Sequence, residues 1–146
     1  MDPALSRLIQ DHLGYSDEEI SLFEKNPRNQ EVMDKAPELM NQTIIAEVVH
    51  SHGCNSRHRV GDRFYFDGAG NLLTTRGPKR ICVYALKAFA SAVHAGNELF
   101  YAGADPNGMR FKRVACHDVG IRCGGWGQIV LEFSMKDRKM KTPPES

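Results

Sequence analysis

The sequence has no long apolar run and only four cysteines. None of its apolar stretches approaches the roughly 18 residues that a membrane-spanning helix needs, so no membrane span is expected. The segment 1–13 carries Asp2, Arg7, Asp11 and His12, which is not typical of a secretory signal. We therefore expect a cytoplasmic protein, in which the cysteines are thiols or metal ligands rather than disulfides.

Motifs of nucleotide and nucleic-acid recognition are also missing. The sequence holds no phosphate-binding loop of the P-loop type and no Gly-x-Gly-x-x-Gly after a strand. It has no basic stripe interleaved with aromatic residues, and its isoelectric point is about 7.7. These features do not favour a nucleic-acid-binding protein.

What is present is an ordinary globular composition with an uneven charge. The 146 residues are 41% hydrophobic and 25% charged, enough for one domain whose core does not depend on disulfides. Residues 1–50 hold ten acidic and four basic residues, a net charge of −6, whereas residues 51–146 hold eight acidic and fifteen basic residues, +7. Either the two halves attract each other, or the acidic half docks on another subunit.

Residues 1–42 are expected to form a helical docking arm. Leu5, Leu8, Ile9 and Leu13 share one helical face, and Gly14 is placed to end that helix. Ser16 to Glu19 form a capping box before a second helix, and Asn26-Pro27 opens a third. Pro37 is expected to kink the third helix or to stop it at Ala36.

Residues 43–135 are expected to form an α+β metal-binding domain, followed by a flexible tail at 136–146. Strands are predicted at 43–49, 63–66, 109–115 and 129–133, with 72–75 returning from a turn. A buried helix is predicted from Ile81 to Ala95, ended by Gly96-Asn97. The fold class is thus a small, mostly antiparallel sheet or an OB-like barrel packed on one helix; a ferredoxin-like variant also fits.

The cysteines carry the chemistry that the sequence suggests. Cys54, Cys82, Cys116 and Cys123 all fall at the ends of predicted elements or in loops, where side chains from separate elements can converge. Four thiolates would complete a tetrahedral zinc site, and they could equally hold an iron–sulfur cluster. However, the spacings of 28, 34 and 7 residues contain no Cys-x-x-Cys pair, and free cysteines often simply pack in a core.

Histidines widen the choice of ligands and of chemistry. His58 shares a loop with Cys54 and is a candidate ligand, while in Cys116-His117 only one of the two side chains can easily point inward. A Cys–His pair oriented by Asp118 would instead make a nucleophile, although no nucleophile signature surrounds either cysteine. The run from Cys123 to Gly127 is interpreted as a tight turn, or as a close approach to a partner or ligand with Trp126 as an anchor.

Residues 44–134 resemble a family of small uncharacterised proteins of anaerobic bacteria and archaea. The resemblance rests on Gly53-Cys54, on Gly61-Asp62-Arg63-Phe64, on Cys82-Val83-Tyr84-Ala85, on Cys116-His117-Asp118 and on a final strand at 130–133. It implies that Cys54, Cys82 and Cys116 belong to one site, ahead of Cys123, with His58 as a candidate fourth ligand. The chain departs from the family at Ala95-Gly96-Asn97, where the family has Gly-Gly.

Two functions follow as hypotheses. The first is a small metal-binding accessory subunit of a larger multisubunit enzyme, such as a carboxylase or radical enzyme of anaerobic metabolism, with zinc in a structural role. Its partner would be the larger subunit, or a second copy bound through the arm. The second is a stand-alone small enzyme or ligand-binding protein that uses a Cys/His metal centre. Four protein ligands would favour the first and three the second.

Overall fold

A computed structural model describes residues 2–138 and divides the chain into two compact units, Met1–Pro37 and Glu38–Ser146. The boundary falls earlier than the end of the predicted arm at residue 42. Leu39 explains the difference, because its side chain is 5% exposed and packs in the core of the second unit.

The first unit is helical, as its capping signals predict. Helix α1 (Pro3–Leu13) begins after Asp2, whose side chain accepts a hydrogen bond from the Ala4 N–H, and it ends at Gly14 with φ of 72°. Helix α2 (Asp17–Lys25) begins at Ser16, whose hydroxyl accepts from the Glu19 N–H at 3.2 Å. Each helix end thus satisfies backbone groups that would otherwise lack partners.

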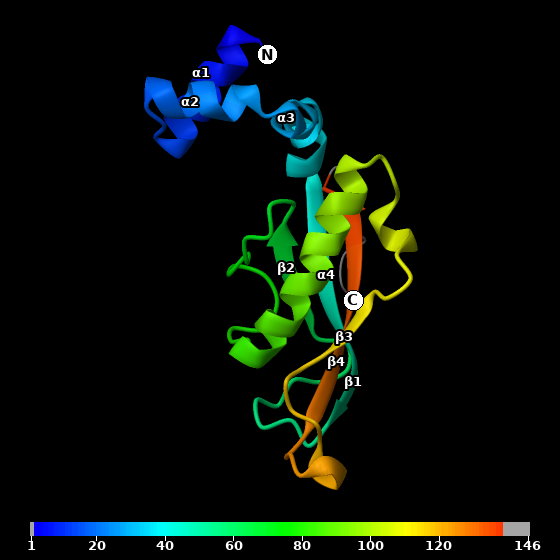
Figure 1. The fold of residues 1–146 in the computed structure, drawn as a ribbon. Helices are drawn as coiled ribbons and strands as arrows, with labels where there is room; N and C mark the ends of the chain where they lie inside the picture. The colour runs from blue at the N-terminus through cyan, green and yellow to red at the C-terminus, as the bar shows by residue number, and fades with distance from the viewer. Residues whose placement is uncertain (1, 139–146) are drawn as a thin grey trace. The chain divides into compact units, whose positions relative to one another are not determined.

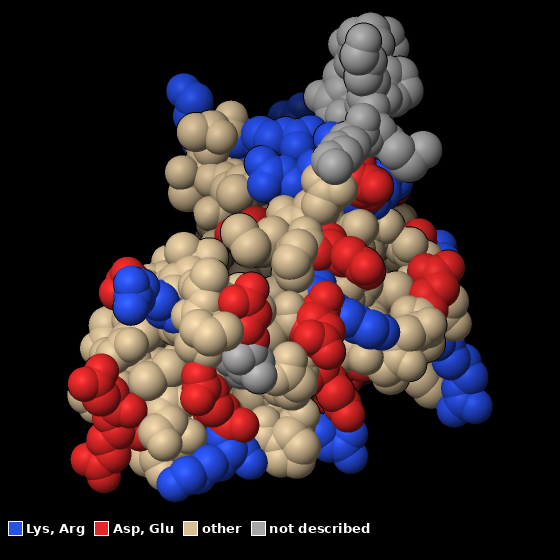
Figure 2. Space-filling model, turned by 90° about the horizontal axis from the view of Figure 1, so that it is seen from above, with Lys and Arg blue, Asp and Glu red and all other residues tan. Residues whose placement is uncertain are grey.

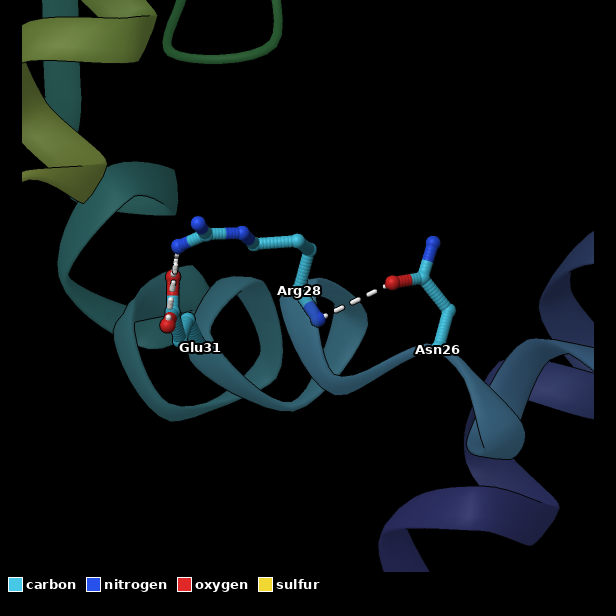
Figure 3. A network of polar contacts seen from close by, with 3 residues as sticks. All are labelled: Asn26, Arg28 and Glu31. Atoms are coloured by element: carbon cyan, nitrogen blue, oxygen red, sulfur yellow. Dashed lines mark hydrogen bonds and ion pairs between the residues drawn. The ribbon is translucent and has the colours of Figure 1, made fainter.

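Helix α3 (Pro27–Met40) begins with a side-chain cap and runs across the unit boundary. The Asn26 carboxamide oxygen accepts from the Arg28 N–H at 3.0 Å, and Arg28 pairs with Glu31 at 3.2 Å on the exposed side (Figure 3). Of the two outcomes predicted for Pro37, the stop at Ala36 is wrong, since the helix continues through Pro37 to Met40, and the kink stays a prediction. The proline ring removes one backbone hydrogen bond of the helix, and the free energy gained by burying Leu39 offsets this loss.

The second unit is an α+β fold built on a four-stranded antiparallel sheet. Its strands are β1 (Gln42–His52), β2 (Arg63–Asp67), β3 (Arg113–Ala115) and β4 (Gln128–Asp137), in the order β2-β1-β4-β3. The fold class predicted from the sequence is therefore confirmed. In the described chain the sheet is open, with β2 and β3 at its edges, so it is a packed sheet and not a barrel.

Helix α4 (Val83–Tyr101) covers one face of this sheet (Figure 1). Alternate residues of the strands point into the core against it, and Phe89 stacks on Phe66 with ring centroids 5.3 Å apart. The sequence predicts that this helix ends at Gly96-Asn97. It instead runs on to Tyr101. Gly96 is needed for close packing, because a Cβ there would lie 2.9 Å from one ring carbon of Phe133 and closer to another.

Three other predicted segments are corrected. The strand predicted at 109–115 is formed only by Arg113–Ala115, because a 3₁₀ turn at Pro106–Gly108 precedes it. The tail predicted from residue 136 begins too early, since Lys136 and Asp137 pair with Thr43 and Gln42 as the end of β4. The rest of that tail, 139–146, lies outside the described residues. Residues 72–75 are predicted to return from a turn after the second strand. They form only one isolated antiparallel bridge, between Leu72 and Phe66.

A row of four charged residues crosses the other face of the sheet. Glu47 lies opposite both Arg63 and Glu132, and Glu132 lies opposite Arg113. The two glutamates would repel each other, but each is paired outward, Glu47 with Arg63 at 2.6 Å and Glu132 with Arg113 at 2.7 Å. The two adjacent glutamates are tolerated because each has an arginine on its other side.

Figure 2 shows that both acidic and basic side chains are exposed on the surface of the protein. Within residues 2–138, no helix combines the length and the apolar character needed to cross a bilayer.

The exposed edge of β4 is closed by a side chain. Strand β3 pairs only with residues 130–132 of β4, and beyond them the Asn107 carboxamide imitates a neighbouring strand. Its nitrogen donates to the Met135 carbonyl at 2.9 Å, and its oxygen accepts from the Met135 N–H at 2.8 Å. The edge is thereby protected from pairing with another chain.

We expect the Asn107→Ala variant to lose roughly 1–3 kcal/mol of unfolding free energy, because both backbone groups of Met135 lose their partner. Asn107→Asp keeps the acceptor and loses the donor, so its stability should fall between those of Asn107→Ala and the wild type. Urea denaturation of the three proteins measures the effect. Equal stability of Asn107→Ala and wild type would contradict the role assigned to this side chain.

Candidate functional site

Three of the four cysteines line one pocket at the end of the sheet. The pocket has a volume of about 200 Å³ and takes its walls from the loop after β1, the start of α4, the end of β3 and the start of β4. Cys54, Cys82 and Cys116 are half-buried free thiols in its lining, and His58 joins them. Cys123 is exposed and does not line the pocket.

Two glycines hold the Cys54 loop against the glycine-rich loop. A Cβ on Gly127 would overlap the Gly53 carbonyl oxygen and lie 2.6 Å from that of His52. A Cβ on Gly53, where φ is 65°, would lie 2.8 Å from the Trp126 carbonyl oxygen. The glycine-rich run thus approaches the backbone of another loop of the same chain, whereas the sequence suggests an approach to a partner or ligand, which stays a prediction. Trp126 and Cys54 both lie in the pocket lining.

Asp118 shapes the glycine-rich loop from within. Its carboxylate accepts N–H groups from Gly120 at 2.9 Å, from Trp126 at 3.0 Å and from Gly127 at 3.0 Å. Gly125 allows the loop to wrap this carboxylate, because a Cβ there would overlap an Asp118 oxygen. The hydrogen bonds from Gly127, Gly120 and Trp126 lower the pKa of Asp118, with a further contribution from His117.

Cys82 is the N-cap residue of α4 and is held by His58. The Cys82 N–H donates to the His58 Nε2 at 3.2 Å, while the Cys82 side chain does not cap the helix. His58 itself is 4% exposed and meets the edge of the Phe64 ring at 5.2 Å between centroids. Ser51 fixes its backbone by donating to the His58 carbonyl at 2.5 Å.

The bond from Cys82 decides what His58 can do. A neutral imidazole has one nitrogen lone pair, and here Nε2 uses it to accept the backbone N–H. Nδ1 must then carry the ring hydrogen, so in this arrangement His58 offers no lone pair to a metal ion. His58 therefore positions Cys82.

Cys116 turns its sulfur into the pocket while His117 points elsewhere. The Cys116 Sγ accepts the Ile129 N–H at 3.4 Å, and its S–H faces the Asp118 carbonyl at 3.8 Å. His117 instead stacks on Tyr84, with centroids 5.3 Å apart. As expected, only the cysteine of this pair faces inward.

The structure does not form the Cys–His–Asp118 arrangement that the nucleophile hypothesis requires. Asp118 would have to orient a histidine beside a cysteine, but its carboxylate is held by three backbone N–H groups. His50 and His52 lie in β1 and do not line the pocket. What the site brings together is a set of three thiols in the lining of one pocket.

These thiols do not form a ready-made coordination shell. Across residues 2–138, no three His, Cys, Asp or Glu side chains are arranged so as to hold a metal ion. Each cysteine has a single side-chain torsion, so rotation of that torsion is the movement by which the sulfurs could converge. The donor set itself, three thiols, suits soft or borderline cations.

His58 predicts a pH dependence of stability. Burial lowers its pKa below the ordinary value of 6.5; Asp62 opposes this effect and Arg80 reinforces it. The unfolded chain therefore binds a proton more readily, and unfolding free energy should fall as the pH drops from about 6.5 towards the lower pKa of the folded state.

Urea unfolding of wild type and His58→Gln, at intervals of about one pH unit between pH 5 and 8, tests this dependence. The glutamine can still accept the Cys82 N–H but does not titrate, so its stability should change less with pH. An identical slope in both proteins would show that His58 is not the group responsible.

Comparisons with models of known protein families, with curated proteins and with solved structures gave no match to the chain. Its class is therefore defined by its own fold and site: a small α+β protein with an antiparallel sheet, one long helix packed on it, and a three-thiol pocket at the end of the sheet.

Proposed function

We propose that the protein binds one soft or borderline metal ion, zinc in the first instance, through the thiolates of Cys54, Cys82 and Cys116. The observation that carries the proposal is that these three thiols come from separate elements of the fold and line one pocket. The resemblance noted in the sequence singles out the same three cysteines.

One hydrogen bond and one helix N-terminus favour negative charge on the sulfur at two of the positions. The Ile129 N–H already points at the Cys116 sulfur, and such a donor stabilises a thiolate bound to a metal. Cys82 sits at the N-terminus of a helix of 19 residues, where the helix dipole favours negative charge. An iron–sulfur cluster is the alternative, but it commonly takes four cysteines.

Three protein ligands leave one coordination position open. Cys123 is exposed outside the pocket and the His58 lone pair is occupied, so neither supplies a fourth ligand in this arrangement. A structural zinc site is closed by four protein ligands, whereas an open position serves ligand binding or catalysis. The geometry therefore favours a stand-alone ligand-binding protein or small enzyme with a thiolate metal centre.

An accessory role in a larger enzyme complex is the second candidate, and the first unit supports it. Its helices expose Leu8, Leu13 and Leu22 at 65%, 51% and 59%, on a markedly acidic segment. Exposed leucines on short helices are typical of surfaces that pack against a partner. The partner would be a larger enzyme subunit or a second copy of the chain.

Metal analysis of anaerobically purified protein tests the proposal. We expect about one zinc per chain in a colourless solution, and fewer reactive thiols than in the metal-free protein. A brown solution with iron and sulfide would replace zinc by a cluster. A chain that takes up no zinc or cobalt on titration, and keeps all four thiols reactive, would overturn the metal site.

A further inference from the structure

Apolar side chains are exposed on the first turn of α4 and on the glycine-rich loop, the two segments that meet at the thiol pocket. We call this set the end patch; its members are between 54% and 73% exposed, and they are Val83, Tyr84, Val119, Ile121 and Trp126. The stacked rings of Tyr84 and His117 join the helix to the loop, and Tyr84 and Trp126 both line the pocket. The end patch is therefore one surface built from two segments that are far apart in the sequence.

The loop part of the end patch has a fixed backbone. Asp118 accepts N–H groups from three positions of the loop, and the Gly125 N–H donates to the Gly120 carbonyl at 2.8 Å. A surface held in this way loses little conformational freedom when a partner covers it. Tryptophan is also enriched among the residues that carry most of the binding energy of an interface. These features support the interpretation of Trp126 as an anchor for a partner.

Basic side chains border the end patch. Residues 79–97 and 119–131, which contain the patch, hold four Lys or Arg residues and no Asp or Glu. Arg80 and Lys87 flank its helical part and Arg122 lies in its loop, and all three are exposed. The neighbouring Asp118 carboxylate is engaged by the backbone of its own loop. A partner that fits this surface combines apolar side chains with acidic charge.

The first unit of the chain has this combination. Residues 1–37 hold eight acidic and four basic residues, a net charge of −4, and they expose Leu8, Leu13 and Leu22. Among residues 2–37, Ile9 and Ile20 are the only buried hydrophobic residues. Units shorter than about 40 residues usually need a disulfide, a metal or association with another chain to be stable. Coverage of the exposed leucines by a partner would supply the burial that this unit lacks.

We infer that the first unit of one copy docks on the end patch of a second copy. The first unit ends at Pro37, shortly before β1, whereas the end patch lies beyond the far end of this strand, and its 11 residues span about 35 Å. The first unit of a second copy is free of that constraint, and two such contacts related by a twofold axis close a dimer. This inference rests on the second candidate function, whose partner it names, and it does not use the metal site.

Sedimentation equilibrium of the full chain measures the dissociation constant of the dimer, with a reductant present so that the exposed Cys123 does not link copies. We expect a wild-type dimer whose dissociation constant rises with salt concentration, because surfaces of opposite charge meet. Trp126→Ser should raise the dissociation constant by about thirtyfold, as for the anchor residue of an interface. Phe111→Ser is the matched control, because Phe111 is 74% exposed, as Trp126 is at 73%, and lies outside the end patch; it should leave the dimer unchanged.

A mixing experiment identifies the two surfaces. The double variant Leu8→Ser/Leu22→Ser should weaken the dimer as Trp126→Ser does, because it removes exposed leucines of the first unit. In a mixture of these two proteins, the first unit of the Trp126→Ser copy meets an intact end patch on the leucine variant. One of the two contacts is thereby restored, so the mixture should form dimers more tightly than either variant alone.

The outcomes that contradict the inference are distinct. A wild type that stays monomeric at every concentration overturns the second copy as the partner and leaves docking on a larger subunit. A dimer that survives Trp126→Ser, or a mixture no more dimeric than its components, overturns the end patch as the docking surface. A dimer that survives the leucine substitutions overturns the docking role of the first unit, and the second candidate function fails with it. Metal titration of the same proteins tests the metal site separately.

Discussion

Gly127→Ala is expected to cost about 3 kcal/mol of unfolding free energy, since the new methyl group would overlap the backbone of Gly53 and His52. Neither neighbour is the end of a flexible side chain, so a strand end or a loop must move. The loop that would move carries Cys54, and the variant should therefore also bind metal more weakly than wild type.

Two other glycines serve as controls for this variant. Gly108 has open space around it and a backbone that other residues adopt, so Gly108→Ala should stay within about 0.5 kcal/mol of wild type. Gly68 abuts the Leu39 backbone, and Gly68→Ala should destabilise the fold as Gly127→Ala does. It should nevertheless keep its metal affinity, because Gly68 and Leu39 are not part of the pocket lining.

Chemical denaturation and metal titration on all three variants give the two measurements. If Gly127→Ala lost stability but bound metal like the wild type, the contact made by Gly127 would matter for the fold and not for the metal site. A Gly127→Ala protein as stable as wild type would show that the two loops do not need their close approach.

Replacing Cys54, Cys82 or Cys116 by serine is expected to lower metal affinity by about a hundredfold or more, since a hydroxyl is a poor ligand for soft cations. Each variant should also lose the increase in melting temperature that metal gives to the wild type, because an ion bound only by the folded chain stabilises it. Cobalt or zinc titration and thermal unfolding with and without metal measure the two effects together.

Cys123→Ser is the matched control for this series. Its thiol is exposed and lies outside the pocket, so affinity and metal-dependent stabilisation should remain those of the wild type. His58→Gln is a second comparison, expected to keep most of the metal affinity because His58 positions Cys82 without binding the ion. Loss of binding in Cys123→Ser, with retention in the other three serine variants, would overturn the assignment of ligands.

Local signals in the sequence predicted the helix starts well. The caps at Ser16 and Asn26 are set by side chains that bond backbone groups two or three residues away, so neighbouring residues contain the whole interaction. Signals that depend on distant packing were misleading. Pro37 does not end α3 and Gly96 does not end α4, because Leu39 and Phe133 decide those positions from the core.

The site shows the same division. The sequence by itself determined the candidate thiols, four cysteines at element ends or in loops without a disulfide context, and it marked the run around Gly127 as a tight turn or as an approach to a partner or ligand. It could not determine that Asp118 organises a loop, or that the His58 lone pair is used by a backbone N–H of Cys82. Both facts depend on hydrogen bonds between segments that the sheet brings together.

The α+β class, the helical first unit and the list of candidate thiols therefore follow from the order of residues, because periodicity, capping and residue chemistry are local properties. Which three thiols share a pocket follows only from tertiary structure. The antiparallel pairing of β1, β3 and β4 brings the loop after β1 and the end of β3 to the start of α4, and leaves Cys123 on the outer side of its loop. Convergence of side chains is a property of packed strands, and no spacing along the chain encodes it.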